Sequence, residues 1–154
     1  MIRTIVVPVD GSSCAEHAVD LAGDIASKYR GRIALFHVLL LGHVPERLRR
    51  LSGKQGAAPG DGVERELDRA VRVDIAEQIL DRARKRAEFH GARRVESAWA
   101  EGPVTERILE HAEDQQADMI VLGSRGLSDL KSLKVGSVAH KVTHLFDRSV
   151  VVVK

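Results

Sequence analysis

Hydrophobic positions along this chain follow two alternating patterns. Short, nearly continuous apolar runs rich in β-branched residues are typical of strands that are buried on both faces of a sheet. Between these runs lie longer segments in which apolar residues recur every three or four positions, as on one face of a helix. The predicted strands cover residues 2–9, 33–40, 95–100, 118–122 and 149–153, and the predicted helices cover residues 13–31, 64–90, a segment beginning at 102–103 that carries Val104, Ile108, Leu109 and Ala112, and residues 137–146.

Local signals indicate where these elements begin and end. Pro8 near the end of the first run is acceptable because the terminus of a strand tolerates the loss of one ladder donor. Ser13 and Glu16 have the spacing of a capping box, which predicts that the first helix begins there. Gly102-Pro103 is a suitable start for the third helix, because proline is favoured in the first turn.

The order βαβαβαβαβ predicts one doubly wound α/β domain over residues 1–154. Each crossover between parallel strands needs a covering helix, so helices are expected on both faces of a parallel sheet. The length of 154 residues fits a single domain. An open sheet of this kind binds ligands beyond the carboxyl ends of its strands, where the strand order reverses. The residues that follow the first, second and fourth strands are therefore the candidates for a site.

The periodic pattern lapses between residues 42 and 62. This segment contains five glycines, two prolines and the basic stretch Arg47-Leu48-Arg49-Arg50. A loop of this length inside a compact domain is usually functional or mobile. The basic stretch is a candidate to fold over bound phosphates, and residues 49–52 also resemble a basic-directed kinase site, a pattern that recurs by chance.

Composition excludes several classes of partner. The 24 basic and 22 acidic side chains leave a formal net charge of +2, which does not favour nucleic acid or an anionic membrane. Aromatic residues make up only 3% of the chain, so a base-stacking surface is not expected. No apolar run approaches the ~18–20 residues that cross a bilayer. The single cysteine, Cys14, has no partner for an internal disulfide, which agrees with a reducing cytoplasm.

Glycines and basic residues after the fourth strand predict a phosphate site. Gly123-Ser124-Arg125-Gly126 follows the strand, and Gly136-Ser137 opens the next helix. Glycine lets a backbone approach a ligand closely, and the free N–H groups of a helix N-terminus attract anions. Ser137 is a candidate cap and phosphate donor, and Arg125 and Lys134 are candidate counter-charges. The same residues also suit plain turns and a helix cap, so the residues alone leave both interpretations open.

Asp10 closes the first strand, which is expected to lie beside the fourth. A carboxylate in this position can accept hydrogen bonds from two ribose hydroxyls. Asp10-Gly11 is also a strong turn pair in its own right, so an Asx turn is the alternative. Val38 and Leu39, at the end of the second strand, offer backbone groups and an apolar wall to a base.

Other chemical signals are weak. His140 and His144 are four residues apart on the last helix, but no third ligand lies near them in the sequence, so an ordinary surface pair is expected rather than a metal site. Cys14 is expected to be a small buried residue. Neither a nucleophile elbow nor a Gly-x4-Gly-Lys-Ser/Thr phosphate loop is present. A phospho-acceptor receiver domain needs a cluster of acids after the first strand and an aspartate after the third, where this chain has Glu101.

The spacing Gly123-x2-Gly126-x9-Gly136-Ser137 resembles the nucleotide-binding motif of the universal stress protein family. The resemblance covers nearly the whole chain apart from residues 42–62. It extends to 7–12, 36–38, 117–123 and 150–153. It implies five parallel strands in the order 3-2-1-4-5, a cytoplasmic location, and a homodimer that forms through the last strand.

The same resemblance implies a set of binding residues. The family divides into members that bind ATP or another adenine nucleotide and members that lack the motif, and this chain resembles the binding branch. Asp10 would hold the ribose, Val38 would contact the adenine, and the glycine motif with Arg125, Ser137 and the N–H of Val138 would surround the phosphates. The expected set is Pro8, Val9, Asp10, Val38, Leu122, Gly123, Arg125, Gly126, Gly136, Ser137 and Val138.

The function expected from these observations is that of an adenine-nucleotide-binding module, with ATP, ADP or AMP as ligand and a regulatory or protective role in a stress response. Hydrolysis is expected to be slow at most, because the sequence presents no clear general base. Mg²⁺ is expected only with the phosphates of the nucleotide. Three alternatives stay open: a weak ATPase or ATP-dependent transferase that uses Asp10 or Glu101, a cyclic-AMP-binding protein, and a nucleotide-free interaction dimer with an unknown protein partner.

Overall fold

The computed structural model of the chain describes residues 1–39, 62–127 and 135–154. The predicted loop at 42–62, apart from its last residue, lies outside the described residues, and so does Lys134. The strands are β1 (Thr4–Pro8), β2 (Arg32–Leu39), β3 (Val95–Glu101), β4 (Met119–Gly123) and β5 (Ser149–Val153), and the helices are α1 (Ser13–Tyr29), α3 (Gly62–Phe89), α4 (Val104–Asp114) and α5 (Ser137–Leu145).

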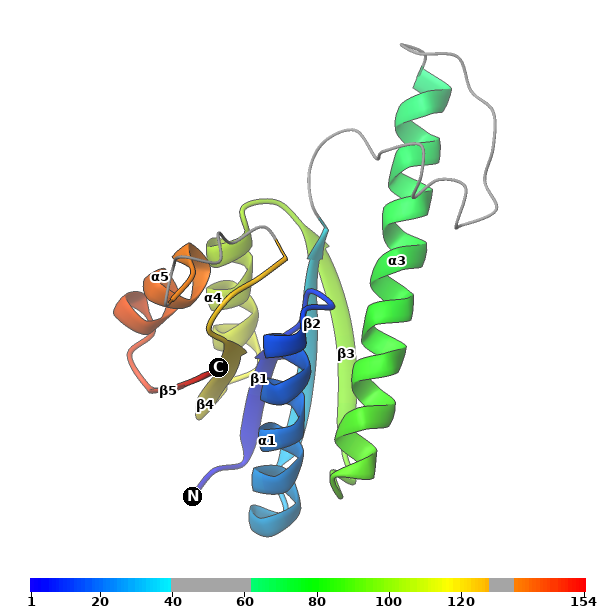
Figure 1. Cartoon of the computed structure of the whole chain (residues 1–154). Coiled ribbons are helices and arrows are strands. Elements are labelled where there is room, and N and C mark those ends of the chain that lie inside the picture. The colour runs from blue at the N-terminus through cyan, green and yellow to red at the C-terminus, as the bar shows by residue number, and fades with distance from the viewer. Residues whose placement is uncertain (40–61, 128–134) are drawn as a thin grey trace.

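The strands form one parallel sheet in the order β3-β2-β1-β4-β5, as Figure 1 shows, which confirms the predicted fold. The central strands are buried on both faces, and Ile5, Val6 and Val7 of β1 are 0% exposed. This burial explains why the first run of the sequence is apolar at consecutive positions instead of alternate ones.

Strand β1 is shorter than the predicted 2–9 because its start is held by a side chain. The backbone N–H groups of Arg3 and Thr4 both donate to Oδ2 of Asp118, at 2.7 and 2.9 Å. These hydrogen bonds hold the pKa of the Asp118 carboxyl below its ordinary value. The carboxylate therefore takes the place of a ladder partner at this end of the strand.

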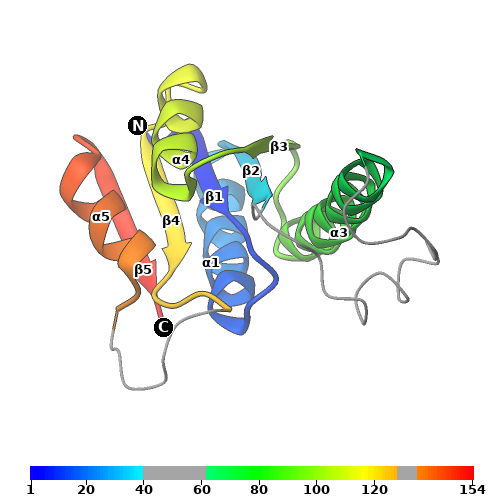
Figure 2. The same ribbon diagram turned by 90° about the horizontal axis from the view of Figure 1, so that it is seen from above.

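Two layers of helices cover the sheet. Helices α1 and α3 pack on one face and α4 and α5 on the other, as seen from above in Figure 2. Alternate residues of β1 and β2 enter opposite cores, so that Val7 and Leu35 contact the α1–α3 side while Val6 and Phe36 contact the α4–α5 side. This alternation decides which strand residues can reach a ligand on a given face.

The helix caps differ from the predicted ones. Ser12, and not Ser13, is the N-cap of α1, and its Oγ accepts the N–H of Ala15 at 3.2 Å. Gly136 is the N-cap of α5, so the predicted capping role of Ser137 is wrong. At α1 the reason is local, because Asp10 accepts the N–H of Ser12 and Gly11 takes the left-handed φ of 84°. This turn places Ser12 one residue before the helix.

An ordered series of ion pairs joins α1 to α3. The acids Glu16, Asp20 and Asp24 lie on one face of α1 at four-residue steps. Arg82 and Arg86 of α3 pair with the first two acids, and His90, directly after α3, lies 3.2 Å from Asp20 and 3.0 Å from Asp24. The central pair is bidentate, with Nη2 of Arg86 2.7 Å from Oδ2 of Asp20. These contacts raise the pKa of Arg86 above its ordinary value. They define the charge zipper, which is the set of these six residues.

Candidate functional site

A cavity of about 230 Å³ lies at the carboxyl ends of β1, β2 and β4, where the first turns of α4 and α5 also converge. This is the position at which an open α/β sheet binds ligands. The residues that line it are Pro8, Val9, Asp10, Ser12, Ala15, Phe36, His37, Val38, Val104, Ile108, Leu122, Gly123, Ser124, Arg125, Gly126, Leu127, Ser137, Val138 and Ala139. Of the expected set of binding residues, Gly136 alone is not part of this wall. Leu39, which was expected beside Val38 as an apolar wall, is buried but does not line the cavity, because successive residues of a strand point to opposite faces of the sheet.

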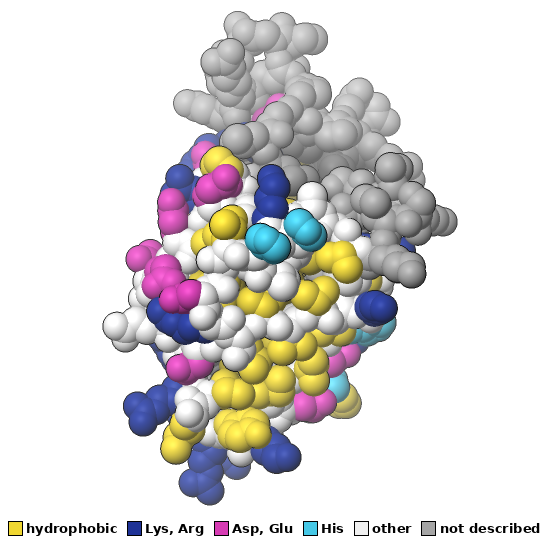
Figure 3. Space-filling view, turned by 90° about the vertical axis from the view of Figure 1, so that its left-hand side faces the viewer, with side chains coloured by type: hydrophobic (Ala, Val, Ile, Leu, Met, Phe, Trp, Pro, Cys, Tyr) yellow, Lys and Arg dark blue, Asp and Glu magenta, His cyan; other side chains and the backbone are white. Residues whose placement is uncertain are grey.

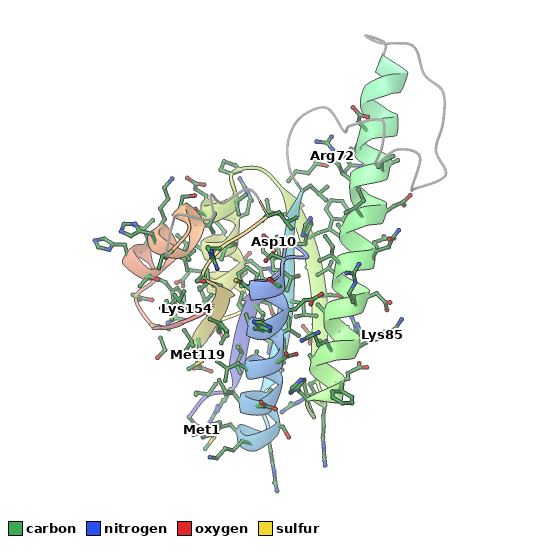
Figure 4. All side chains as sticks on the ribbon, in the orientation of Figure 1. Met1, Asp10, Arg72, Lys85, Met119 and Lys154 are labelled. Atoms are coloured by element: carbon green, nitrogen blue, oxygen red, sulfur yellow. The ribbon has the colours of Figure 1, made fainter. Side chains whose placement is uncertain are left out.

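Asp10 lies at the rim of the sheet, beyond the end of β1 (Figure 4), and connects two loops. Its Oδ1 accepts the N–H of Ser12 at 2.9 Å, and its Oδ2 accepts the N–H of Leu127 at 3.1 Å. Ser12 strengthens the same link, because its Oγ donates to the carbonyl of Arg125 at 3.4 Å. The Asx turn expected as the alternative is therefore present, and the carboxylate that makes it also lines the cavity.

Gly123 is a glycine because α1 leaves no room for a side chain. A Cβ at this position would lie 2.8 Å from the backbone N of Ala15 and 2.8 Å from the carbonyl carbon of Cys14. Carbon atoms do not approach a backbone so closely without displacing it. The glycine thus lets the end of β4 pack directly against the first turn of α1, a structural requirement that the motif spacing alone does not reveal.

The first turn of α5 supplies donors to one end of the cavity. The N–H of His140 donates to the carbonyl of Gly136 at 3.0 Å, so the N–H groups of Ser137, Val138 and Ala139 precede the first hydrogen bond of the helix. All three residues line the cavity. Gly136 anchors this turn from outside the wall, because its N–H donates to the carbonyl of Ser124. With Arg125 in the same wall, this end favours an anion.

The opposite end of the cavity is apolar. Phe36 and Val38 are two positions apart on β2 and therefore share one face of the strand, and Ile108 contributes from α4. All three side chains are buried. Pro8, Val104 and Leu122 complete this wall. A flat apolar group fits such an environment, since the residues named here carry no charge.

Sequence reasoning missed nine of the residues in the wall. Phe36 could have been predicted from the sequence, because it is two positions before Val38 and alternate residues of a strand share a face. Val104 and Ile108 are one helical turn apart, but the sequence does not say which face of the sheet their helix covers. The complete missed set is Ser12, Ala15, Phe36, His37, Val104, Ile108, Ser124, Leu127 and Ala139.

Two histidines, the buried His37 and the half-buried His111, stay neutral at neutral pH. His37, at the edge of the cavity, donates its Nδ1–H to the carbonyl of Val9 at 2.7 Å, and its burial lowers its pKa. The carbonyl can only accept, which fixes the tautomer with the proton on Nδ1. His111 of α4 stacks against Phe36, and burial lowers the pKa of His111 as well. His37 therefore helps to hold the backbone that leads into Asp10.

Among the described residues, candidate catalytic and metal groups do not assemble. Glu101 forms an ion pair with Arg69 at 2.6 Å and does not line the cavity. Cys14 is buried, as expected, with the hydroxyl of Ser124 at 3.9 Å from its sulfur. His140 and His144 are exposed and stack on each other, and across the described ranges no three metal-ligating side chains gather. Within the same ranges, no helix has the length and apolar character to span a membrane.

Comparisons with known proteins agree on one family. The model of the universal stress protein family matches residues 1–154. The chain is 30% identical to the universal stress protein YxiE of Bacillus subtilis over 164 aligned residues, with all of both proteins covered. It is 28% identical to the universal stress protein MJ0577 of Methanocaldococcus jannaschii, again over its full length and over 96% of that protein.

Solved structures give the same picture. The structure of MJ0577 superposes with a TM-score of 0.76 at 26% identity and covers 100% of this chain and 96% of that one. A universal stress protein described as a complex with cAMP superposes with a TM-score of 0.68 at 26% identity, covering 99% of this chain and 96% of the other. Both similarities span the cavity and the sheet around it.

Proposed function

The chain belongs to the universal stress protein family, and from this premise we propose that it binds an adenine nucleotide, ATP foremost, in the cavity at the carboxyl edge of the sheet. The observation that carries the proposal is the polarity of one continuous wall. An apolar end, a carboxylate and a helix N-terminus beside an arginine follow one another, which matches the order base, sugar, phosphate.

Each predicted residue has a role in this proposal. The base lies against Pro8, Val38 and Leu122, and the ribose hydroxyls donate to the carboxylate of Asp10. The phosphates meet Arg125, the N–H groups of Ser137 and Val138, and the backbone near Val9, Gly123 and Gly126. Gly136 acts indirectly by holding the turn that presents Ser137.

The nucleotide controls a loop connection in this proposal. Asp10 already accepts the N–H of Leu127, so a ribose that hydrogen-bonds to Asp10 shares or replaces that contact. Nucleotide binding is thereby linked to the loop from the end of β4 to Leu127. This link supports a regulatory or protective binding module over a rapid enzyme, since no second carboxylate lines the cavity beside Asp10 within the described residues. Mg²⁺ would be held by the phosphates and water instead of by a protein cluster.

Cyclic AMP is a second candidate ligand. It shares the adenine and the ribose ring, and a related structure at 26% identity is described as a complex with cAMP. The cyclic ester occupies the 3′ hydroxyl, so Asp10 would receive one ribose hydrogen bond in place of two.

The proposal also includes a cytoplasmic homodimer that pairs through β5. Strand β5 lies at the edge of the sheet, and within the described chain β4 is the only strand that pairs with it. Figure 3 shows hydrophobic side chains gathered on this side of the molecule, where Leu145 is 64% exposed and the valines of β5 are partly exposed. A reducing compartment agrees with the single cysteine.

Calorimetric titration of nucleotide-free protein with ATP, ADP, AMP and cyclic AMP, with and without Mg²⁺, tests the function. We expect micromolar binding of at least one of them. Gly126→Val should weaken binding at least about tenfold because a branched side chain in the wall blocks the approach of the phosphates. Gly136→Val should weaken it as well, because a branched residue at this cap disturbs the turn that presents Ser137. The φ of −72° at Gly136 is open to any residue, so this substitution tests the cap and not backbone strain.

Leu145→Val, at an exposed position in the last turn of α5, is the matched control, because it places the same β-branched side chain on the same helix outside the cavity wall. It should bind like the original protein. Folded glycine variants that bind nucleotide equally well would overturn the site, and an absence of binding by the unmodified protein would leave the interaction dimer as the function.

A further inference from the structure

An aromatic pair forms part of the apolar end of the cavity. Phe36 lines the cavity from β2 and is only 4% exposed. Its ring stacks on that of His111 in α4, with centroids 4.1 Å apart and planes inclined by 7°. His111 itself is not among the residues that line the cavity. The orientation of the Phe36 ring therefore depends on a neighbour behind the wall.

The surroundings of one ring nitrogen favour an uncharged histidine. Nε2 of His111 is buried and has no hydrogen-bond partner in the described part of the chain. An unpaired lone pair is tolerated in such a position, whereas a protonated nitrogen would bury a charged N–H without an acceptor. Protonation must therefore move the ring toward solvent or admit water beside Phe36.

The charged groups around His111 come from three elements. Burial is the main cause that lowers its pKa, Asp114 on the same helix raises it, and Arg32 on β2 lowers it. The guanidinium of Arg32 is itself held by Glu96 of β3 at 3.2 Å and by the side chain of Gln115 at 2.9 Å. Arg32 is thus fixed beside the ring and opposes its protonation.

We propose that His111 is a positioning residue for the nucleotide: its neutral ring holds Phe36 flat against the base, and its protonation releases Phe36 and weakens binding. The proposal rests on the adenine-nucleotide function proposed above. It makes the base end of the cavity sensitive to mildly acidic pH, whereas the phosphate end, formed by α5, is unaffected.

Cyclic AMP is the appropriate probe, because its phosphodiester keeps one negative charge across the range tested and contributes no titration of its own. We expect its affinity for the protein to fall at least about threefold between about pH 7.5 and pH 5.5. In His111→Phe, which keeps a stacked ring but does not titrate, the affinity at pH 7.5 should stay within about twofold and the acid-dependent loss should shrink. His111→Ala removes the stack and should bind at least about fivefold more weakly even at pH 7.5.

Two features of the design separate His111 from other groups. His37 lines the cavity and also has a lowered pKa, but it is unchanged in all of these proteins, so its contribution cancels in the comparison. His144→Phe, at an exposed position of α5, makes the same chemical change away from the base and should keep the original pH profile.

A second measurement needs no nucleotide. The chain has three phenylalanines, Phe36, Phe89 and Phe146, so the ring signals of Phe36 can be assigned by NMR. They should shift together with the titration of His111 in the ligand-free protein. If His111 titrates while the Phe36 signals stay fixed, the proposal is overturned.

The outcomes distinguish this proposal from the function on which it rests. Failure of every adenine nucleotide to bind at either pH would overturn the proposed function, and with it the contact between Phe36 and a base. Binding with the same pH profile in the original protein and in His111→Phe would overturn the role of His111 alone. The proposal would be supported if His111→Phe kept the affinity for cyclic AMP at pH 7.5 with a weaker pH dependence, while His111→Ala lost affinity.

Discussion

Asp10 is the residue at which structure and proposed function compete for the same atoms. Both of its carboxylate oxygens already accept backbone N–H groups, from Ser12 and from Leu127. Asp10→Asn keeps one acceptor oxygen but removes the charge, so we expect ATP to bind about tenfold more weakly, because hydrogen bonds to charged groups contribute about 1.5–3 kcal/mol. Calorimetry measures this loss.

A ligand that lacks both ribose hydroxyls serves as the control for Asp10. If the carboxylate contacts the ribose, the dideoxy nucleotide should bind the original protein and Asp10→Asn with similar affinity. Equal losses for ATP and for the dideoxy analogue would mean that Asp10 acts only through the turn that it stabilises.

Gly123 gives a prediction about stability that is separate from ligand contact. In Gly123→Ala the new Cβ would meet the backbone of Cys14 and Ala15, which cannot rotate away as a long side chain would. We expect the free energy of unfolding to fall by about 1–3 kcal/mol, measured by urea denaturation. Equal stability of Gly123→Ala and the original protein would contradict the packing argument.

Residue spacing predicted the glycine motif and Asp10 well, because these residues follow the strands directly and reach the cavity through backbone or short side chains. It did not predict Val104 or Ile108. Their contribution depends on which face of the sheet α4 covers, and that choice is made by packing against Phe36 and Val6 from a distant part of the chain. The cap of α1 lies one residue before the predicted one for a local reason, since the turn at Asp10-Gly11 sets it.

The charge zipper shows how elements rather than single residues are positioned. Asp20 has a 22% exposed side chain and accepts hydrogen bonds from Arg86 while it also faces His90. We expect Asp20→Asn to lower the free energy of unfolding by about 1 kcal/mol, reduced from the value of a fully buried pair because Arg86 is partly exposed to solvent. High salt should reduce the difference in free energy of unfolding between Asp20→Asn and the original protein, because it screens the ion pair.

An ion pair within α3 provides the matched control. Asp81 and Lys85 are one turn apart on the helix and both are well exposed, at 59% and 73%. Asp81→Asn removes a charge of the same kind but breaks no contact between helices, and should cost less than about 0.5 kcal/mol. If the two variants were equally stable, the zipper would have no special role in holding α3 on the sheet.

Periodicity placed every described strand and helix within a few residues, because two periods suffice to tell a doubly buried strand from an amphipathic helix. The sequence pattern did not predict the charge zipper. Its members are regularly spaced in the sequence, but pairing α1 with α3 requires the knowledge that both helices cover the same face (Figure 2).

At the scale of the whole molecule, the buried His37 and the half-buried His111 predict a loss of stability in mild acid. The pKa values of His37 and His111 lie below the ordinary value of 6.5, so both residues bind protons more readily in the unfolded chain than in the folded one. Their contribution is complete above about pH 6.5 and is lost as the pH falls through their folded pKa values. Each histidine can add at most about 1.4 kcal/mol per pH unit to the slope of the free energy of unfolding against pH. The contribution of His111 is smaller because solvent screens it.

Urea denaturation between about pH 7.5 and pH 5 measures this slope. His111→Phe should reduce the slope, while His140→Gln and His144→Gln, at exposed positions, should not change it. Asp118 affects stability at a lower pH. Because the pKa of its carboxyl is lowered in the folded protein, the stability it contributes is lost only below about its ordinary pKa of 3.8. A flat profile down to pH 5 would contradict the neutral burial of the two histidines.

The proposed dimer can be tested through the direction of one peptide group. The carbonyl of Val153 accepts the N–H of Ser124, so it faces β4, and by alternation the N–H of Val152 faces away from the sheet. Val152→Pro therefore removes an outward donor but leaves the ladder with β4 intact. We expect this variant to sediment as a monomer at micromolar concentration, whereas Val152→Ala, which retains the N–H, stays dimeric. Since the cavity is formed from β1, β2 and β4 with α4 and α5, the monomer should still bind nucleotide. If Val152→Pro remained folded and dimeric, the subunits would associate through another surface, and the exposed edge of β5 would have to be protected by other means.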